Sequence, residues 1–136
     1  MQKTLSRVLL YGFPVGAYCS FIFFLSSRPS PESIPQFFGV DKLLHIGAYG
    51  LLGILFFRAY GITSAGKSTT LLIIFSILSA GLYGISDEIH QSFNPARNPS
   101  IADVIADFLG AGLGVWFYHY IALRFPALSA NHRLTR

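Results

Sequence analysis

The sequence has little charge and only one cysteine. Charged residues make up 12% of the 136 residues, whereas an ordinary soluble domain carries about 25%. Hydrophobic residues make up 52%, so the chain cannot cover a water-exposed surface and lipid is the expected solvent. Cys19 is the only cysteine, which excludes an internal disulfide and a metal site built from several cysteines.

A pattern typical of nucleic-acid binding is also missing. The formal net charge is +4, but the basic residues do not form a stripe with interleaved aromatic residues. They lie at the ends of apolar runs, as expected for the flanks of membrane-spanning segments. We therefore expect no nucleic-acid partner. The length allows a single domain over residues 1–136.

Four apolar segments are long enough to cross a membrane as helices, which takes about 20 residues each. They run from about residue 5 to 25, 43 to 60, 69 to 86 and 101 to 123. Loops rich in proline or polar residues separate them, at 26–40, 61–68 and 94–99. The sequence therefore predicts an all-α polytopic membrane protein, a bundle of four transmembrane helices.

The basic residues are divided unequally between the two sides of the membrane. Seven lie with the termini and the second loop: Lys3, Arg7, Arg58, Lys67, Arg124, Arg133 and Arg136. Three lie on the other side: Arg28, Lys42 and Arg97. An excess of Lys and Arg marks the cytoplasmic side, so we expect both termini in the cytoplasm. All the acids then fall on the outer side: Glu32, Asp41, Asp87, Glu88, Asp103 and Asp107.

Polar residues with helical spacing gather at the outer ends of the last three segments. The second begins with three residues spaced four apart: Asp41, His45 and Tyr49. The third ends with four polar residues: Asp87, Glu88, His90 and Gln91. The fourth begins with two aspartates one turn apart, after a loop arginine: Asp103, Asp107 and Arg97. Spacings of three and four share a helical face, so we expect Asp87, His90 and Gln91 to lie on one face.

Glycines on the same segments favour close packing of the helices, which would bring the polar ends together. They are Gly47, Gly50, Gly53, Gly81, Gly84, Gly110 and Gly114.

Two interpretations compete for the acids and the histidine. Asp41 and Asp103 lie in first helical turns, where a carboxylate suits the helix dipole. Ser100 and Asp103 also fit the S-x-x-D pattern of a capping box. His45 and Asp107 lie about one turn inside their segments, where an ionisable group is costly. For these two residues we favour a functional role.

Two stretches resemble the VanZ-like family of bacterial membrane proteins, DKLLHIGAYGLLG at 41–53 and SDEIHQSFNPARNPSIADVIADFLGAGLG at 86–114. The family pattern has an aspartate and a histidine leading into the second helix, then D-E-x-x-Q, a loop arginine and D-x-x-x-D. The matching residues are Asp41, His45, Asp87, Glu88, Gln91, Arg97, Asp103 and Asp107. The resemblance implies a multi-pass protein of the bacterial plasma membrane. The family is named after a member associated with resistance to the glycopeptide teicoplanin, so the resemblance also implies a link to that resistance.

A binding protein is the first functional class that the polar cluster supports. It would hold a cell-envelope lipid headgroup or a lipid-linked cell-wall precursor, or dock a partner membrane protein. The binding residues would be Asp41, Tyr49, Gln91, Arg97 and Asp103. A transporter is less well supported, because the inner halves of the segments lack the polar groups that transport usually needs.

An enzyme is the second class. It would be a membrane-embedded, metal-dependent hydrolase or transferase acting on a phosphorylated lipid. The catalytic residues would be His45, Asp87, Glu88, His90 and Asp107. Carboxylates and imidazole suit a divalent cation, and a guanidinium suits a phosphate. No H-E-x-x-H motif is present, and no serine or cysteine stands beside a base. The sequence leaves both classes open.

Overall fold

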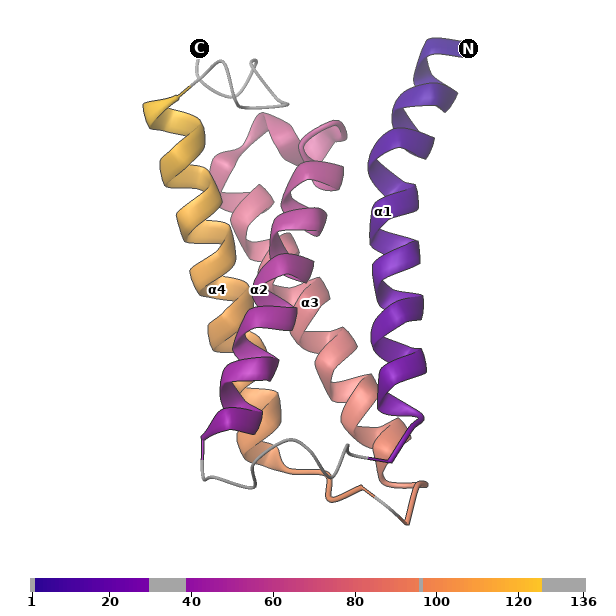
Figure 1. Cartoon of the computed structure of the whole chain (residues 1–136). Helices are drawn as coiled ribbons and strands as arrows, with labels where there is room; N and C mark the ends of the chain where they lie inside the picture. Colours follow the sequence, from indigo (N-terminus) through magenta and orange to yellow (C-terminus); the bar gives the residue numbers. More distant parts are fainter. Residues whose placement is uncertain (1, 30–38, 96, 126–136) are drawn as a thin grey trace.

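The computed structural model describes residues 2–29, 39–95 and 97–125. These residues form four α-helices and one short 3-10 helix, with no strand among them: α1 (Gln2–Ser26), α2 (Val40–Tyr60), η1 (Ser64–Lys67), α3 (Thr69–Gln91) and α4 (Ile101–Arg124). The helices run alternately up and down, so α1 and α3 end where α2 and α4 begin (Figure 1). The predicted all-α bundle of four helices is confirmed.

All four α-helices are long and apolar enough to cross a membrane. Their outward faces carry large hydrophobic side chains that are more than half exposed, such as Leu10, Phe13, Leu82 and Trp116. A water-soluble protein would bury such residues, whereas lipid tails solvate them. The chain is therefore a multi-pass membrane protein.

Three helices extend further than their apolar runs. α1 begins at Gln2, α2 begins at Val40 and α3 ends at Gln91, whereas the apolar pattern predicted starts near residues 5 and 43 and an end near 86. Backbone hydrogen bonds within a helix do not require apolar side chains, so the polar residues continue the helix. Most of the proline-rich loop expected before α2 lies outside the described residues.

α2 and α4 pack closely through glycine. A Cβ atom on Gly110 would collide with the backbone of Ile46, and one on Gly114 with the backbone of Gly50. Glycine at these positions lets the two helix backbones come into contact, and a larger side chain would hold them apart. The expected role of the glycines is confirmed here, but it is wrong for Gly47, whose added Cβ would meet nothing within 4 Å.

α1 lies at the side of the bundle and contacts α2 and α3 but not α4 over the described residues (Figure 1). Two tyrosines tie it to the other helices. The Tyr18 hydroxyl donates to the Ala48 carbonyl of α2 at 3.2 Å, and the Tyr83 hydroxyl of α3 donates to the Cys19 carbonyl at 2.5 Å. The core is therefore made chiefly by α2, α3 and α4.

Candidate functional site

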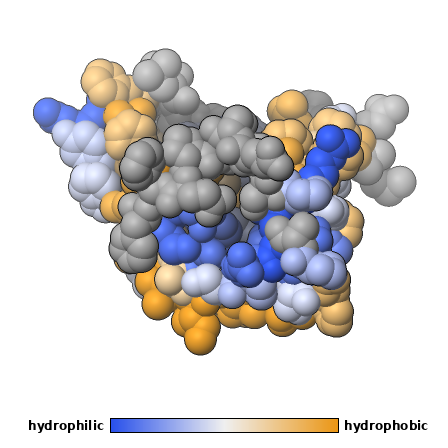
Figure 2. Space-filling model, turned by 60° about the horizontal axis from the view of Figure 1, so that its bottom comes forward, coloured by the Kyte–Doolittle hydropathy of each residue, from blue (hydrophilic) through white to orange (hydrophobic). Residues whose placement is uncertain are grey.

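One end of the bundle gathers the described acids, and we call it the acidic end. It comprises the last turns of α1 and α3 and the first turns of α2 and α4, with the carboxylates Asp41, Asp87, Glu88, Asp103 and Asp107. The remaining acid, Glu32, lies outside the described residues. Figure 2 views this end and shows hydrophilic surface bordered by hydrophobic surface on its lower side. The described acids thus share one pole of the molecule.

His45 and Asp107 form a hydrogen-bonded pair between α2 and α4. The His45 Nδ1 and the Asp107 Oδ1 are 2.8 Å apart, and Asp107 has no exposed surface. A carboxylate only accepts hydrogen bonds, so Nδ1–H donates and the lone pair of the imidazole lies on Nε2. The His45 ring also stacks parallel to Tyr49, with centroids 6.1 Å apart. The expected common face of these two residues is confirmed.

Gly84 of α3 makes room for the Asp107 carboxyl group. A Cβ atom at Gly84 would overlap the carboxylate and lie only 2.9 Å from its Cγ. Glycine is therefore needed where α3 passes this side chain. The predicted closeness of α3 and α4 is confirmed, because the Asp107 carboxyl group of α4 lies against the backbone of α3 at Gly84.

Lys42 is a residue of the site that sequence reasoning missed. Its ammonium forms ion pairs with Asp41, at 3.0 Å, and with Asp103. Asp103 is 4% exposed, whereas the Asp41 side chain is 61% exposed, so the lysine joins a buried acid to a surface one. A single lysine among the acids of this end was the signal that pointed to it.

The capping box expected at the start of α4 is wrong. The Ser100 hydroxyl does cap the helix by accepting from the Ala102 amide at 3.1 Å. The Ser100 amide, however, donates to Glu88 Oε2 of α3 at 2.8 Å. Asp103 does not complete the box because its carboxylate pairs with Lys42 of α2. Glu88 therefore joins the end of α3 to the start of α4.

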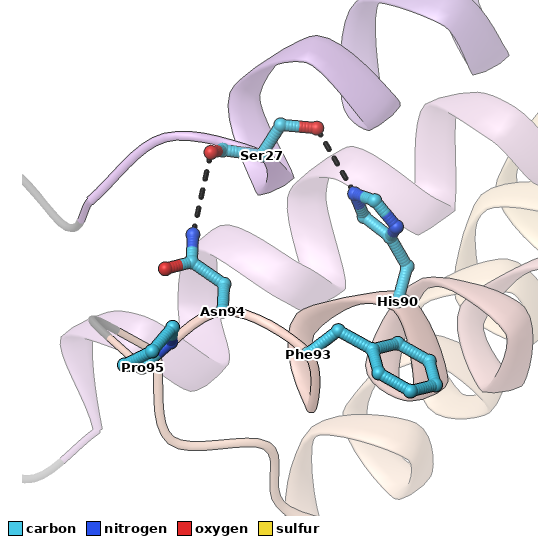
Figure 3. Close-up of a pocket in the computed structure, with 5 residues that line it drawn as sticks. All are labelled: Ser27, His90, Phe93, Asn94 and Pro95. Atoms are coloured by element: carbon cyan, nitrogen blue, oxygen red, sulfur yellow. Dashed lines mark hydrogen bonds between the residues drawn. The ribbon is translucent and has the colours of Figure 1, made fainter.

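Asp87 and Gln91 pair as their spacing predicts, but His90 does not share their face. Gln91 Nε2 donates to Asp87 Oδ2 at 3.0 Å. His90 turns toward α1, where its Nε2 is 3.0 Å from the Ser27 hydroxyl (Figure 3). The centroid of its ring lies 4.4 Å from that of Phe23. Residues 90 and 91 are about 100° apart around a helix. Gln91 is buried within the bundle, so His90 points toward the end of α1 instead.

A cavity of about 300 Å³ lies beside His90, lined also by Ser27, Phe93, Asn94 and Pro95 (Figure 3). The lining residues come from the end of α1, the end of α3 and the following loop. None of the five described acids lines it. His90 therefore lies in a separate environment from the acids.

Arg97 binds the end of α1. Its Nε donates to the Arg28 carbonyl and its Nη2 to the Leu25 carbonyl, each at 2.8 Å. The last carbonyls of a helix lack partners within the helix, and a basic side chain commonly satisfies them. The guanidinium therefore holds α1 against the loop before α4.

Four side chains of α2, α3 and α4 at the acidic end each have a buried polar oxygen with no hydrogen-bond partner among the described residues. The atoms are Tyr49 Oη, Asp87 Oδ1, Glu88 Oε1 and Asp107 Oδ2. Each of these residues is less than 8% exposed. Tyr49 lies within electrostatic range of the three carboxylates. The arrangement can accept several hydrogen bonds from a ligand or bind a cation.

A groove of about 270 Å³ between α3 and α4 leads to one of these residues. Its polar residues include Glu88 and Ser100, and apolar side chains form much of its wall: Ile85, Ile89, Ile101 and Val104.

Three residues at this end could also bind a metal ion. One potential ligand atom from each of Asp41, His45 and Asp103 lies within 4.8 Å of the others.

The fold and the site define a class: a multi-pass helical membrane protein whose described acids gather at one end of its bundle. The sequence model of the VanZ/LLP1 family matches residues 13–123. The chain belongs to this family, as the motifs at its helix ends indicated. No curated protein and no solved structure matches the chain.

Proposed function

We propose that this protein binds the polar headgroup of a cell-envelope lipid, or of a lipid-linked cell-wall precursor, at its acidic end. The proposal rests on four buried oxygens of α2, α3 and α4 that have no partner in the described part of the chain, those of Tyr49, Asp87, Glu88 and Asp107. Leaving a buried polar group without a hydrogen bond costs about 1–3 kcal/mol. A ligand that brings O–H or N–H donors removes this cost, and lipid headgroups supply such donors at the membrane surface.

The groove between α3 and α4 supports the same ligand. Its volume of about 270 Å³ suits a headgroup more than a whole lipid, and Glu88 contributes to its lining. The apolar residues Ile85, Ile101 and Val104 in its wall suit the start of an acyl or prenyl chain. Headgroup and chain would thus meet polar and apolar surface in the order in which they occur in a lipid.

The proposal places the acidic end at the outer surface of the bacterial plasma membrane, in keeping with the seven-to-three division of the basic residues. A protein that holds a cell-wall precursor there changes the access of a glycopeptide antibiotic to it. A link to teicoplanin resistance follows from the proposal in this way.

Native mass spectrometry of the purified protein in mixed micelles tests the proposal. Phosphatidylglycerol and a polyprenyl-diphosphate-linked sugar carry hydroxyl donors in their headgroups, whereas phosphatidylcholine carries no N–H or O–H donor. We expect the first two lipids to be retained in preference to phosphatidylcholine. Glu88→Gln keeps an acceptor for the Ser100 amide but loses the charge, so retention should fall about tenfold.

His90→Gln is the matched control, because His90 lies at the same end but outside the acid cluster. It should leave retention unchanged. Equal retention of all three lipids by the unaltered protein would contradict the proposal.

One observation favours a second candidate function, a hydrolase or transferase acting on a phosphorylated lipid. The hydrogen bond between Asp107 and His45 is the arrangement that orients a histidine as a general base. The same spectra distinguish the two functions, because an enzyme would release a cleaved headgroup and His45→Gln would abolish that release.

A further inference from the structure

Two of the five described carboxyl groups at the acidic end, those of Asp87 and Glu88, have no ion pair among the described residues. This end holds the carboxylates Asp41, Asp87, Glu88, Asp103 and Asp107. Among the described residues, the basic groups in ion pairs with them are the Lys42 ammonium and the His45 ring. Buried carboxylates are usually paired or bound to a metal, because an unpaired charge is costly away from water. Buried carboxyl groups without such a partner favour a bound cation.

We propose that a divalent transition-metal cation binds between α2 and α4, with Asp41, His45 and Asp103 as its protein ligands. One potential ligand atom from each residue lies within 4.8 Å of the other two. Bonds of about 2.0–2.2 Å to nitrogen and oxygen would require only a small closure of this triangle. A set of imidazole and carboxylate ligands suits Zn²⁺ or Mn²⁺.

His45 is already oriented for metal binding. Asp107 accepts the hydrogen bond from Nδ1 at 2.8 Å, which leaves Nε2 with its lone pair as the ligand atom. Metal-bound histidines commonly donate their other ring N–H to a carboxylate in this way, and the carboxylate fixes the ring and raises its basicity. Asp107 is thus a positioning residue for the proposed ligand.

Glu88 supplies an independent observation that points to a ligand. It is 7% exposed, and its Oε1 is buried without a hydrogen-bond partner in the residues that the structure describes. Its carboxylate lies within electrostatic range of both Asp103 and His45. The buried oxygen therefore lacks a hydrogen-bond donor, which a water molecule bound to the cation would supply.

The Lys42 ammonium contacts two of the three proposed metal ligands. The ammonium joins Asp41 to Asp103, as a divalent ion bound to both would. The lysine side chain is 33% exposed and has a flexible stem, so it can move into water when a metal binds. Lysine and metal therefore compete for the same two carboxylates.

The inference deepens the headgroup proposal and depends on it only for the use of the metal. Acidic residues alone repel the phosphate of a lipid headgroup, whereas a bound divalent cation reverses the local charge. The cation would bind the phosphate while the remaining carboxyl oxygens accept hydrogen bonds from headgroup hydroxyls.

The test is a titration of the full-length protein, in detergent and free of added lipid, with Mn²⁺ after treatment with EDTA. Electron paramagnetic resonance measures free Mn²⁺, and Zn²⁺ serves as competitor. We expect one Mn²⁺ per chain. Lys42→Gln removes the competing charge and should tighten binding about tenfold, whereas Lys67→Gln, at the opposite end of the bundle, should leave it unchanged.

Two ligand-side variants complete the test. Asp107→Asn should weaken binding about 10- to 100-fold, as loss of an orienting carboxylate does elsewhere. Asp41→Asn should weaken it further, and Asp41 is too exposed for this change to disturb folding. Absence of Mn²⁺ and Zn²⁺ binding in both the unaltered protein and Lys42→Gln would overturn the inference, as would equal affinities for Lys42→Gln and Lys67→Gln.

A final measurement separates this inference from the headgroup proposal. Lipid retention is measured with EDTA and with Mn²⁺. Donor-bearing lipids retained equally under both conditions, without metal binding, would leave the headgroup proposal standing and overturn the cation. Metal binding without preferential lipid retention would support the cation and contradict the headgroup proposal.

Discussion

The Asp107 carboxyl group lies in the interior of the bundle. The side chain has no exposed surface. One oxygen accepts from His45, and the other lies against Gly84 without a hydrogen-bond partner in the described chain. Asp103, one turn earlier, is also buried but pairs with Lys42, which is partly exposed. The surroundings of Asp107 are therefore more deeply buried than those of Asp103.

We expect Asp107→Asn to destabilise the protein more than Asp103→Asn. Asp107→Asn replaces a buried, charge-assisted hydrogen bond to His45 by a neutral one and should cost about 1–3 kcal/mol. Asp103→Asn keeps a polar side chain beside Lys42, which is 33% exposed and retains Asp41 as its second partner, so it should cost about 1 kcal/mol. Thermal unfolding in detergent measures both. A larger loss for Asp103→Asn would show that the ion pair across α2 and α4 matters more than the histidine pair.

The contact between α2 and α4 depends on the absence of side chains at a few positions. Gly110 touches the backbone of Ile46, and Gly114 touches that of Gly50. This contact sets the distance between the first turns of the two helices. Those turns carry His45 and Asp107, so the hydrogen bond between them depends on the glycines below it.

Gly110→Ala tests this dependence between elements. Its new methyl group would overlap the Ile46 backbone, so we expect a loss of about 1–3 kcal/mol, as for an overpacked core. Gly112→Ala is the matched control, because its Cβ would meet nothing within 4 Å. Alanine is the better helix former by about 1 kcal/mol, so the control should be neutral or stabilising. Equal destabilisation of the two variants would contradict a close α2–α4 contact.

The whole molecule has two chemically different ends. The described acids lie at one end, and the start of α1 and the end of α4 lie at the other (Figure 1). The second end also carries Arg58 and Lys67, near the end of α2 and in η1. This separation gives the bundle a strong basis for a single orientation in the membrane.

We expect reporter fusions to find the end opposite the acidic end, which carries Arg58 and Lys67, in the cytoplasm. Fusions after Lys67 and at Arg136 should report an inside position, and a fusion after Asn94 an outside position. The seven-to-three division of Lys and Arg is the physical basis. An outside signal at the C-terminus would reverse the orientation and place the acidic end in the cytoplasm.

The four spans and the grouping of the acids were predictable from the sequence. A run of about 20 apolar residues must become a helix in lipid, because no other local structure pairs its own backbone groups there. Helical spacing alone also placed His45 with Tyr49 and Asp87 with Gln91, since both pairs lie on one helix. These features depend only on residues close to one another along the chain, so they can be read from the sequence.

The partners between helices depended on packing. His90 faces Ser27, Glu88 holds the Ser100 amide and Lys42 reaches Asp103. Each contact joins two elements whose rotation about their own axes no spacing rule specifies. For α2, α3 and α4 those rotations follow from the glycine contacts of α2 and α4 and from the fit of Gly84 against Asp107. Periodicity shows which residues share a face, but only the close packing of helices determines which faces meet.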